Sequence, residues 1–178
     1  FASGVPTDDN NLVARALQLC GKNAHIHIEK NIPHGGGLGG GSSDAAAVLR
    51  WAGYSDFVAA SRLGADIPFC LHGGRARVTG IGEILEPLPF VAREITLVVP
   101  PFGVSTPAVY KAFDSLHAHH DGPNDLEPAA LVVEPQLALW RDRIREASGQ
   151  SPVLAGSGAT WWLDGAHPRI HEALSEAT

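Results

Sequence analysis

The sequence predicts an α+β protein with two lobes, because helix-like and strand-like segments follow one another along the chain. Residues 42–52 include the alanine-rich run of a helix, whereas residues 95–99 form a β-branched apolar run typical of a buried strand. The segment Glu-Pro-Leu-Pro at 86–89 looks like a crossing between lobes. We therefore expect one lobe at 1–85, a second at 86–178, and the functional site between them.

Composition narrows the classes of function. A hydrophobic content of 44% and a charged content of 18% are ordinary for a soluble globular protein of 178 residues. A net charge of −6 disfavours a general grip on nucleic acid. No apolar run has the length of a membrane span, and no signal peptide is visible. We expect no nucleic-acid or membrane partner and a cytoplasmic location, with Cys20 and Cys70 as buried thiols.

The first lobe is expected to open with a helix and a strand. Apolar residues recur on one face of residues 11–20, as in a core-facing helix, and Asp9 or Asn10 can cap it. Residues 24–30 alternate apolar and polar side chains, which predicts a half-buried strand. Within that strand, His25 and His27 have no nearby third partner that would make a metal site.

The stretch at 32–47, IPHGGGLGGGSSDAAA, contains six glycines in the seven positions 35–41. Glycine loses entropy on folding and adds no packing, so such a cluster indicates a backbone with positive φ that comes close to a ligand. Ser42, Ser43 or Asp44 can cap the helix that follows. A glycine loop that opens onto a helix N-terminus offers unpaired N–H groups and the positive end of the dipole. The pattern predicts a phosphate-binding loop.

Three other interpretations of the loop fit less well. A flexible Gly/Ser linker is not usually flanked by a strand and a helix. The Walker A loop requires a lysine after its glycines, and none follows here. The dinucleotide-binding fingerprint requires an acidic residue after a second strand, and Asp66 instead precedes Ile67 and Pro68.

The sequence from Pro33, Pro-x-Gly-Gly-Gly-Leu-Gly-Gly-Gly-Ser-Ser-Asp-Ala-Ala, resembles the second motif of the GHMP small-molecule kinases. Its triple-glycine form is similar to the branch that acts on 4-diphosphocytidyl-2-C-methyl-D-erythritol in the non-mevalonate isoprenoid pathway. Gly-Ala-Asp-Ile-Pro at 64–68 is similar to that branch's Gly-Ala-Asp-Val-Pro, and 124–127 matches its Asn-Asp-Leu-Glu. Residues 155–160, Ala-Gly-Ser-Gly-Ala-Thr, resemble the third family motif.

The resemblance implies a ribosomal-S5-like ATP lobe, a ferredoxin-like C-terminal lobe and ATP-dependent phosphorylation of the substrate's 2-hydroxyl. Asp66 would accept the hydroxyl proton or orient the hydroxyl. Mg²⁺ is expected with ATP, although no carboxylate ligand is evident. Family members carry a lysine and part of the cytidine site upstream of anything present here, so we expect the N-terminal part of the fold to be missing from this chain. Two segments, 49–66 and 113–124, also look shorter than their family counterparts.

These arguments give two sets of candidate site residues. The nucleotide set is Asn11, Lys30, Pro33, His34, Gly35, Gly36, Gly37, Leu38, Gly39, Gly40, Gly41, Ser42 and Ser43. The substrate set is Asp66, Thr106, Pro107, Tyr110, Gly156, Ser157 and Gly158, with Asp66 as the catalytic residue. Structural alternatives stay open: helix capping for Asn11, Asp66 and Thr106, and a solvated strand end for Lys30.

Two other functions remain to be separated from this one. Another GHMP kinase, of the homoserine or mevalonate type, is disfavoured by residues 124–127 and by the triple-glycine loop. A nucleotide-binding module without catalysis is disfavoured by Asp66. ATP binding without turnover would distinguish the module from a kinase.

Overall fold

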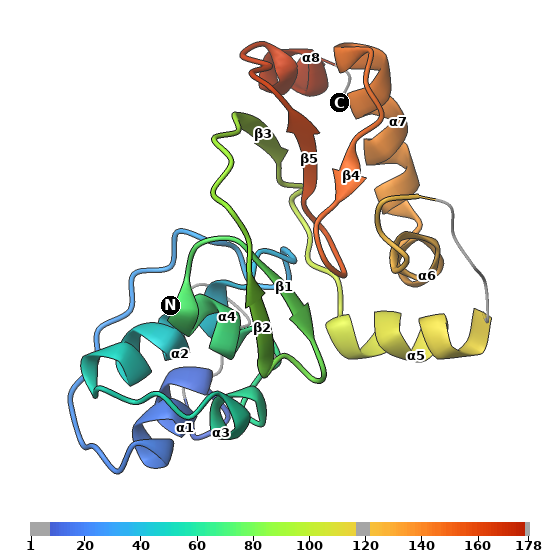
Figure 1. Ribbon diagram of the computed structural model, residues 1–178. Coiled ribbons are helices and arrows are strands. Elements are labelled where there is room, and N and C mark those ends of the chain that lie inside the picture. The colour runs from blue at the N-terminus through green and yellow to red at the C-terminus, as the bar shows by residue number, and fades with distance from the viewer. Residues whose placement is uncertain (1–7, 117–121, 177–178) are drawn as a thin grey trace. The chain divides into compact units, whose positions relative to one another are not determined.

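A computed structural model describes residues 8–116 and 122–176, and these form two compact units. The first unit contains residues 8–34 and 39–91, and the second contains residues 35–38 and 92–176. Each unit combines helices with a small antiparallel sheet (Figure 1), so the predicted α+β class is confirmed. The glycine-rich stretch is divided between the units after Leu38.

The first unit consists of four helices followed by a β-hairpin. Its elements are α1 (Leu12–Leu19), α2 (Gly40–Trp51), α3 (Phe57–Ser61), α4 (Ile67–His72), β1 (Ala76–Thr79) and β2 (Ile84–Pro87). The hairpin register pairs Ala76 with Pro87 and Thr79 with Ile84. The strand therefore extends into residues 86–87, where the sequence predicted a crossing between lobes, and the crossing prediction is wrong for these two residues.

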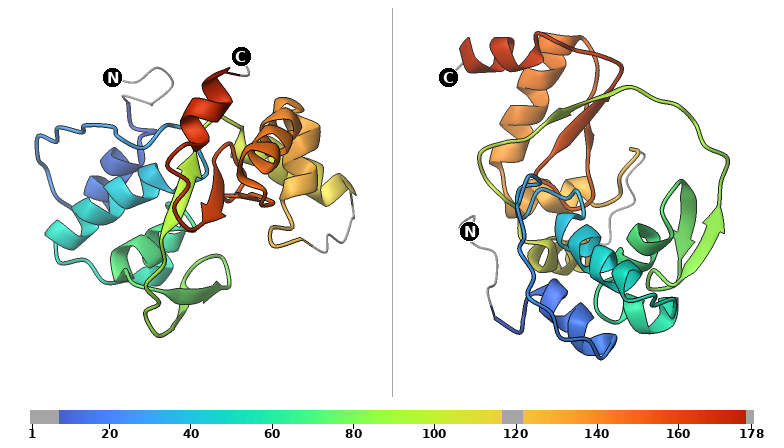
Figure 2. Two further views of the ribbon diagram at one scale, coloured as in Figure 1. Left: turned by 90° about the horizontal axis from the view of Figure 1, so that it is seen from above. Right: turned by 90° about the vertical axis from the view of Figure 1, so that its left-hand side faces the viewer.

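The core of the first unit lies between α1, α2 and α4. Ala16 of α1, Ala45 and Leu49 of α2, and Ile67 of α4 are fully buried. Alanines at the contact let α1 and α2 pack side by side (Figure 2), as their small side chains allow close approach. This packing fixes α2, whose N-terminus is the end of the glycine loop.

The second unit is a three-stranded antiparallel sheet with four helices. Its elements are β3 (Ile95–Val98), α5 (Thr106–Leu116), α6 (Glu127–Val133), α7 (Gln136–Ser148), β4 (Val153–Leu154), β5 (Trp161–Asp164) and α8 (Ile170–Glu176). The strand order is β3-β5-β4, so the central strand is the last one in the chain. Trp161 and Leu154 lie opposite each other in the β4–β5 pair.

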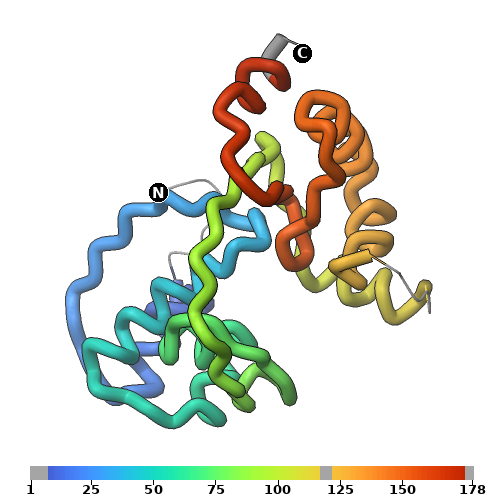
Figure 3. Tube along the Cα trace, turned by 45° about the horizontal axis from the view of Figure 1, so that its top comes forward, coloured from blue at the N-terminus to red at the C-terminus, as the bar shows by residue number. Residues whose placement is uncertain are grey.

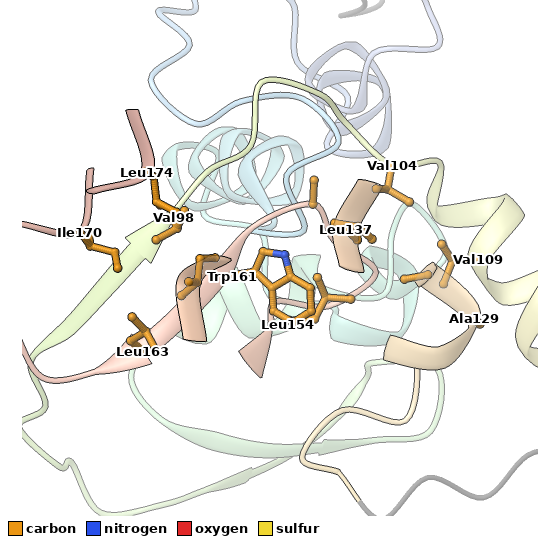
Figure 4. Packing of buried hydrophobic residues seen from close by; sticks show 13 residues of the cluster. Val98, Val104, Val109, Ala129, Leu137, Leu154, Trp161, Leu163, Ile170 and Leu174 are labelled. Carbon is orange, nitrogen blue, oxygen red and sulfur yellow. The ribbon is translucent and has the colours of Figure 1, made fainter. Parts of the chain in front are cut away.

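Trp161 lies within the core of the second unit (Figure 4). Its side chain is fully buried and is surrounded by apolar residues of the sheet and of α5, α6, α7 and α8. Leu137 and Ile144 of α7 are also fully buried. Leu139 lies on a different face of the same helix and is exposed. This core holds the short turn between β4 and β5 in place.

The predicted strand at 24–30 is wrong, because these residues form neither helix nor strand. Figure 3 traces this part of the chain as an open run between α1 and α2. A strand requires a hydrogen-bonded neighbour, and none of the described residues pairs with this segment. Residues 24–30 do alternate apolar and polar side chains. A strand also needs a second segment alongside it, and the alternation cannot show whether that segment exists.

Two predictions of burial are also corrected. The strand predicted at 95–99 is present as β3, but Ile95 is 48% exposed and Leu97 is 37% exposed, because β3 is an edge strand with one face away from the core. Cys20 and Cys70 are free thiols as expected, but both are half-buried rather than buried. None of the helices formed by the described residues is long and apolar enough to cross a membrane.

A first prediction concerns the α7 contact with the core. Leu137→Ala should lower the free energy of unfolding by about 2–5 kcal/mol, because it leaves a cavity beside Trp161. Leu139→Ala removes the same atoms from the same helix, where the side chain is 62% exposed, and should change stability by less than about 0.5 kcal/mol. Equilibrium unfolding in urea checks both values, and equal losses would contradict this assignment of the α7 faces.

Candidate functional site

Helix α2 begins inside the glycine loop and has no side-chain cap. It starts at Gly40, with Gly39 as N-cap at φ 66° and ψ 20°. The carbonyl of Gly39 accepts the first intrahelical bond, from Ser43 N at 2.9 Å. The prediction that Ser42, Ser43 or Asp44 caps the helix is therefore wrong, because these residues already belong to its first turns.

This start leaves the first N–H groups of α2 without partners inside the helix. The N–H groups at the N-cap and in the first turn of a helix have no carbonyl four residues earlier to bond, and no side chain caps them here. They point out of the helix at the positive end of its dipole. An uncapped helix start of this kind can bind an anion, and the binding of phosphate at this loop stays a prediction.

Lys30 is fixed beside this helix start. Its Nζ lies 2.6 Å from Oδ2 of Asp44, and their side chains are 14% and 31% exposed respectively. The same Nζ lies 3.5 Å from the position that a Cβ on Gly40 would occupy. Lys30 is therefore not a solvated strand end, which corrects the alternative left open for it. An ammonium at the positive end of a helix is unfavourable alone, and the carboxylate of Asp44 offsets it.

Asp66 also lies near this helix start. It occupies the N-cap position of α4, yet its side chain accepts no capping hydrogen bond. Its Oδ2 is 4.0 Å from the position that a Cβ on Gly39 would occupy, and the residue is exposed. The carboxylate is thus accessible, close to the uncapped end of α2, and not used to satisfy α4.

The pKa of the Cys70 thiol, one turn into α4, is affected by burial and by Asp66. Burial raises the pKa of the Cys70 thiol, the nearby carboxylate of Asp66 raises the pKa further, and Arg50 acts in the opposite direction. The guanidinium of Arg50 donates to the carbonyl oxygens of Cys70 and Leu71 at 2.6 and 3.2 Å. These contacts connect the end of α4 to α2.

The first half of the glycine loop is held by hydrogen bonds within the second unit. The carbonyl of Gly35 accepts from the N–H groups of Val104 at 3.1 Å and Ala159 at 3.0 Å. The carbonyl of Gly36 accepts from the N–H of Thr160 at 3.1 Å. Part of the close approach that the glycines permit is therefore to the backbone of this chain, in addition to any ligand.

Gly37 shows why a side chain is not tolerated in this half. Its φ is +73°, and a Cβ there would overlap the carbonyl oxygen of Ala155 and lie 2.8 Å from that of Gly158. Both atoms belong to main chain in the turn between β4 and β5, so neither can rotate away. The third motif thus holds the second motif by backbone contact.

The hydroxyls of Thr106 and Ser157 lie 2.7 Å apart. Thr106 is the first residue of α5, and Pro107 follows it in the first turn. Ser157 is 5% exposed and lies between Gly156 and Gly158 in the β4–β5 turn. The structure therefore brings together four of the predicted substrate residues with Pro107 beside them, while Tyr110 is 53% exposed on α5.

The other predicted nucleotide residues lie around the loop or in α1. Asn11 is the N-cap of α1, where its Oδ1 accepts from Val13 N at 2.9 Å, in place of the predicted Asp9 or Asn10. Pro33 and His34 are exposed in the irregular run before the loop. A contact of Asn11, Pro33, His34 or Leu38 with nucleotide stays a prediction.

Two residues of this region were not identified from the sequence. Asp44 was considered as a helix cap, but it is the ion-pair partner of Lys30. Asn124 was noted as part of the Asn-Asp-Leu-Glu match, and its amide donates to two carbonyls of the β4–β5 region. Both contacts join residues 14 or more positions apart, and no local pattern signals them.

No group of three His, Cys, Asp or Glu side chains among residues 8–116 and 122–176 is arranged to hold a metal ion. His25 and His27 lie in the irregular segment. The described part of the chain therefore contains no ready set of side chains for a resident metal.

The uncapped helix at a glycine loop, with a lysine and an accessible aspartate beside it, is an arrangement suited to phosphate transfer. The model of the GHMP kinases N-terminal domain matches residues 11–74, which contain all of these groups. The class is that of the GHMP kinases, and the resemblance seen in the sequence is confirmed.

Similar proteins narrow the class further. A 4-diphosphocytidyl-2-C-methyl-D-erythritol kinase of Paracoccus denitrificans is 40% identical, over 90% of this chain and 66% of the relative. The enzyme of the same name from Cereibacter sphaeroides strain ATCC 17025 is 36% identical, over 99% of this chain and 74% of the relative. A crystal structure of 4-(cytidine 5'-diphospho)-2C-methyl-D-erythritol kinase matches with a TM-score of 0.72 and 33% identity, covering 97% of this chain and 75% of that one.

The chain belongs to the 4-diphosphocytidyl-2-C-methyl-D-erythritol kinase family. It spans about two thirds of the length of the Paracoccus relative (66%) and about three quarters of the chain in the crystal structure (75%).

A second prediction tests the contact between the two glycine motifs. Gly37→Ala should lower the free energy of unfolding by more than the roughly 1–2 kcal/mol expected for a left-handed alanine, because its methyl group also meets fixed backbone. Gly53→Ala is the matched control, since Gly53 has φ +69° and nothing within 4 Å of its Cβ position. Urea unfolding of both variants checks the difference, and equal losses would refute the proposed clash.

A third prediction concerns Cys70 and the charge of Asp66. Because burial and Asp66 raise the pKa of the thiol, less thiolate is present at a given pH, so alkylation of Cys70 should reach half its maximal rate at a higher pH than for an ordinary thiol. Asp66→Asn removes the second cause and should shift this pH downward, while burial keeps it above the ordinary value. Iodoacetamide labelling followed by mass spectrometry measures the profile.

The control for this measurement is Asp56→Asn. Asp56 caps α3 and is not among the causes of the Cys70 shift, so the profile should not move. An unchanged profile in Asp66→Asn would contradict the placement of that carboxylate near the thiol.

Proposed function

We propose that the protein transfers the γ-phosphoryl group of ATP to the 2-hydroxyl of 4-diphosphocytidyl-2-C-methyl-D-erythritol. The names of its relatives support this reaction. The observation that carries the proposal is the position of Asp66, whose carboxylate is exposed, unused in capping, and 4.0 Å from the Cβ position of Gly39 at the start of α2. This is one carboxylate beside one anion site, which is the minimum that phosphorylation of an alcohol requires.

In this proposal, the start of α2 binds the phosphates. The N–H groups of Gly40, Gly41 and Ser42 donate to phosphate oxygens, and the hydroxyls of Ser42 and Ser43 add further donors. Because the helix is packed against α1 and α4, these donors are held in position before the ligand arrives. Such preorganised donors stabilise the charge that develops in a loose phosphoryl-transfer transition state.

The ammonium of Lys30 is held near the start of α2. It is bonded to Asp44 and lies beside Gly40, so it adds positive charge where the phosphates would lie. Mg²⁺ would come with ATP, where phosphate oxygens and water would supply most of its ligands.

Asp66 accepts the proton of the substrate hydroxyl, or orients that hydroxyl if proton loss is late. Its exposure allows the acceptor to reach it, and its position at the start of α4 fixes its backbone. On the acceptor side we propose Thr106, Pro107, Tyr110 and the turn at 156–158, and the 2.7 Å contact between the hydroxyls of Thr106 and Ser157 supports this grouping. We propose a cytoplasmic protein without a nucleic-acid or membrane partner, in keeping with a net charge of −6.

A fourth prediction is the test of this function. The full-length protein should transfer phosphate from MgATP to the diphosphocytidyl substrate, and Asp66→Asn should lower kcat by about 10²–10⁴-fold, because a general base is lost while size and shape are kept. Product formation followed by ³¹P NMR, which reports phosphate at the 2-position, measures the transfer.

Asp56→Asn is the matched control, since it makes the same change at the N-cap of a neighbouring helix. Asp56 accepts from Ala59 N at 2.9 Å, and asparagine caps equally well, so kcat should stay within about twofold. ATP binding with no transfer to this acceptor would discard the proposed reaction. Homoserine, mevalonate and other small alcohols would then be tried as acceptors, and failure with all of them would favour a non-catalytic nucleotide-binding module.

A further inference from the structure

Asn124 joins three parts of the second unit through one side chain. Its Nδ2 donates to the carbonyl oxygens of Leu154 at 2.9 Å and Gly156 at 2.7 Å. Its Oδ1 accepts from Leu126 N at 3.0 Å, just before α6. Both amide hydrogens and one lone pair of the amide oxygen are therefore used, which is three of the four hydrogen bonds that an asparagine side chain can make.

The two carbonyls that Asn124 holds flank Ala155, and this is the residue that meets Gly37. A Cβ on Gly37 would overlap the Ala155 carbonyl oxygen, and a Cβ on Gly156 would lie 3.2 Å from the Gly37 carbonyl oxygen. The same turn continues to Ala159 and Thr160, whose N–H groups bond the loop carbonyls of Gly35 and Gly36. The contacts form one continuous path from Asn124 through the β4–β5 turn to the first half of the glycine loop.

We propose that Asn124 is a positioning residue for nucleotide binding: it fixes the β4–β5 turn on which residues 35–38 of the glycine loop rest. This inference rests on the proposed function, in which the glycine loop receives the phosphates of ATP. Asn124 acts through the turn and need not contact the nucleotide. Displacement of bound groups by about 1 Å is enough to cost roughly a hundredfold in rate, so a lost constraint on the turn should be measurable.

A role in capping alone makes a different prediction. Capping of the segment before α6 uses only the oxygen of Asn124, as acceptor for the N–H of Leu126. Positioning of the turn uses only the NH₂ group, as donor to Leu154 and Gly156. Asn124→Asp keeps the acceptor and the size of the side chain, but it places a carboxylate oxygen opposite two carbonyl oxygens. This substitution separates the two roles.

The fifth prediction is the behaviour of Asn124→Asp in the full-length protein. The Kd for MgATP, measured by titration calorimetry without acceptor, should rise about tenfold to a hundredfold, and kcat/KM for ATP should fall by a similar factor. Hydrogen exchange should accelerate at the amides of Ala159 and Thr160, which donate to the loop. Asp125→Asn is the control, because it makes the reverse exchange, carboxylate to amide, at the neighbouring exposed residue. It should leave the Kd for MgATP within about twofold.

If Asn124→Asp does not fold, Asn124→Ser gives the same measurement, because its hydroxyl can accept from the N–H of Leu126 but is too short to bridge two carbonyls. A lowered Tm or faster exchange with an unchanged Kd for MgATP would overturn the positioning role and leave a structural one. If the unsubstituted full-length protein binds MgATP but does not phosphorylate the diphosphocytidyl substrate, the proposed reaction is wrong. The comparison of Asn124 variants by their Kd for MgATP then remains valid. If the unsubstituted protein does not bind MgATP, both the proposed reaction and the positioning role of Asn124 are refuted.

Discussion

The contact on which the candidate site depends is the one between the carbonyls of Gly35 and Gly36 and three N–H groups of the second unit, those of Val104, Ala159 and Thr160. It assigns residues 35–38 to the second unit, although Gly39 and the helix that follows belong to the first. A residue with a side chain could not replace Gly37 here, because the main chain of the turn leaves no room for a Cβ. The glycines at 35–37 therefore serve packing within the second unit.

Anchoring of this kind has an energetic consequence for anion binding. A free glycine loop would lose much conformational entropy on closing around a phosphate, and that loss would weaken binding. Here Gly35 and Gly36 are bonded within the second unit, and α2 is packed against α1 within the first, so each of these two parts loses conformational entropy during folding rather than on binding. Lys30 adds charge under the same principle, since its ammonium is already held by Asp44 at 2.6 Å. In a site of this kind, the loss of conformational entropy lowers the stability of the fold instead of weakening ligand binding, as expected for preorganised donors.

The sequence predicted the features that arise from local patterns and failed on those that need distant partners. Helices near 11–20 and 42–52 and the strand that became β3 were predicted from local sequence patterns, and the family motifs were found from their residues and spacing. The start of α2 was misplaced by two residues, because serine is a preferred cap and a left-handed glycine at position 39 is not distinguishable from its five glycine neighbours. The segment at 24–30 has the alternation of a strand but no partner among the described residues, and Asn124 reaches carbonyls 30 and 32 residues away.

The contrast between Asp56 and Asp66 bears most directly on whether the site supports catalysis or only nucleotide binding. Both aspartates precede a short helix. Asp56 has an extended backbone, with ψ 98°, and its carboxylate caps α3. Asp66 has helical backbone angles, with φ −84° and ψ −11°, which turn its side chain away from the N–H groups it would cap, and Pro68 removes one of those donors. Forgoing a cap costs about 1 kcal/mol, and a protein that only bound nucleotide would gain nothing from an exposed negative charge beside its phosphate site. This local loss supports the catalytic role that we propose for Asp66.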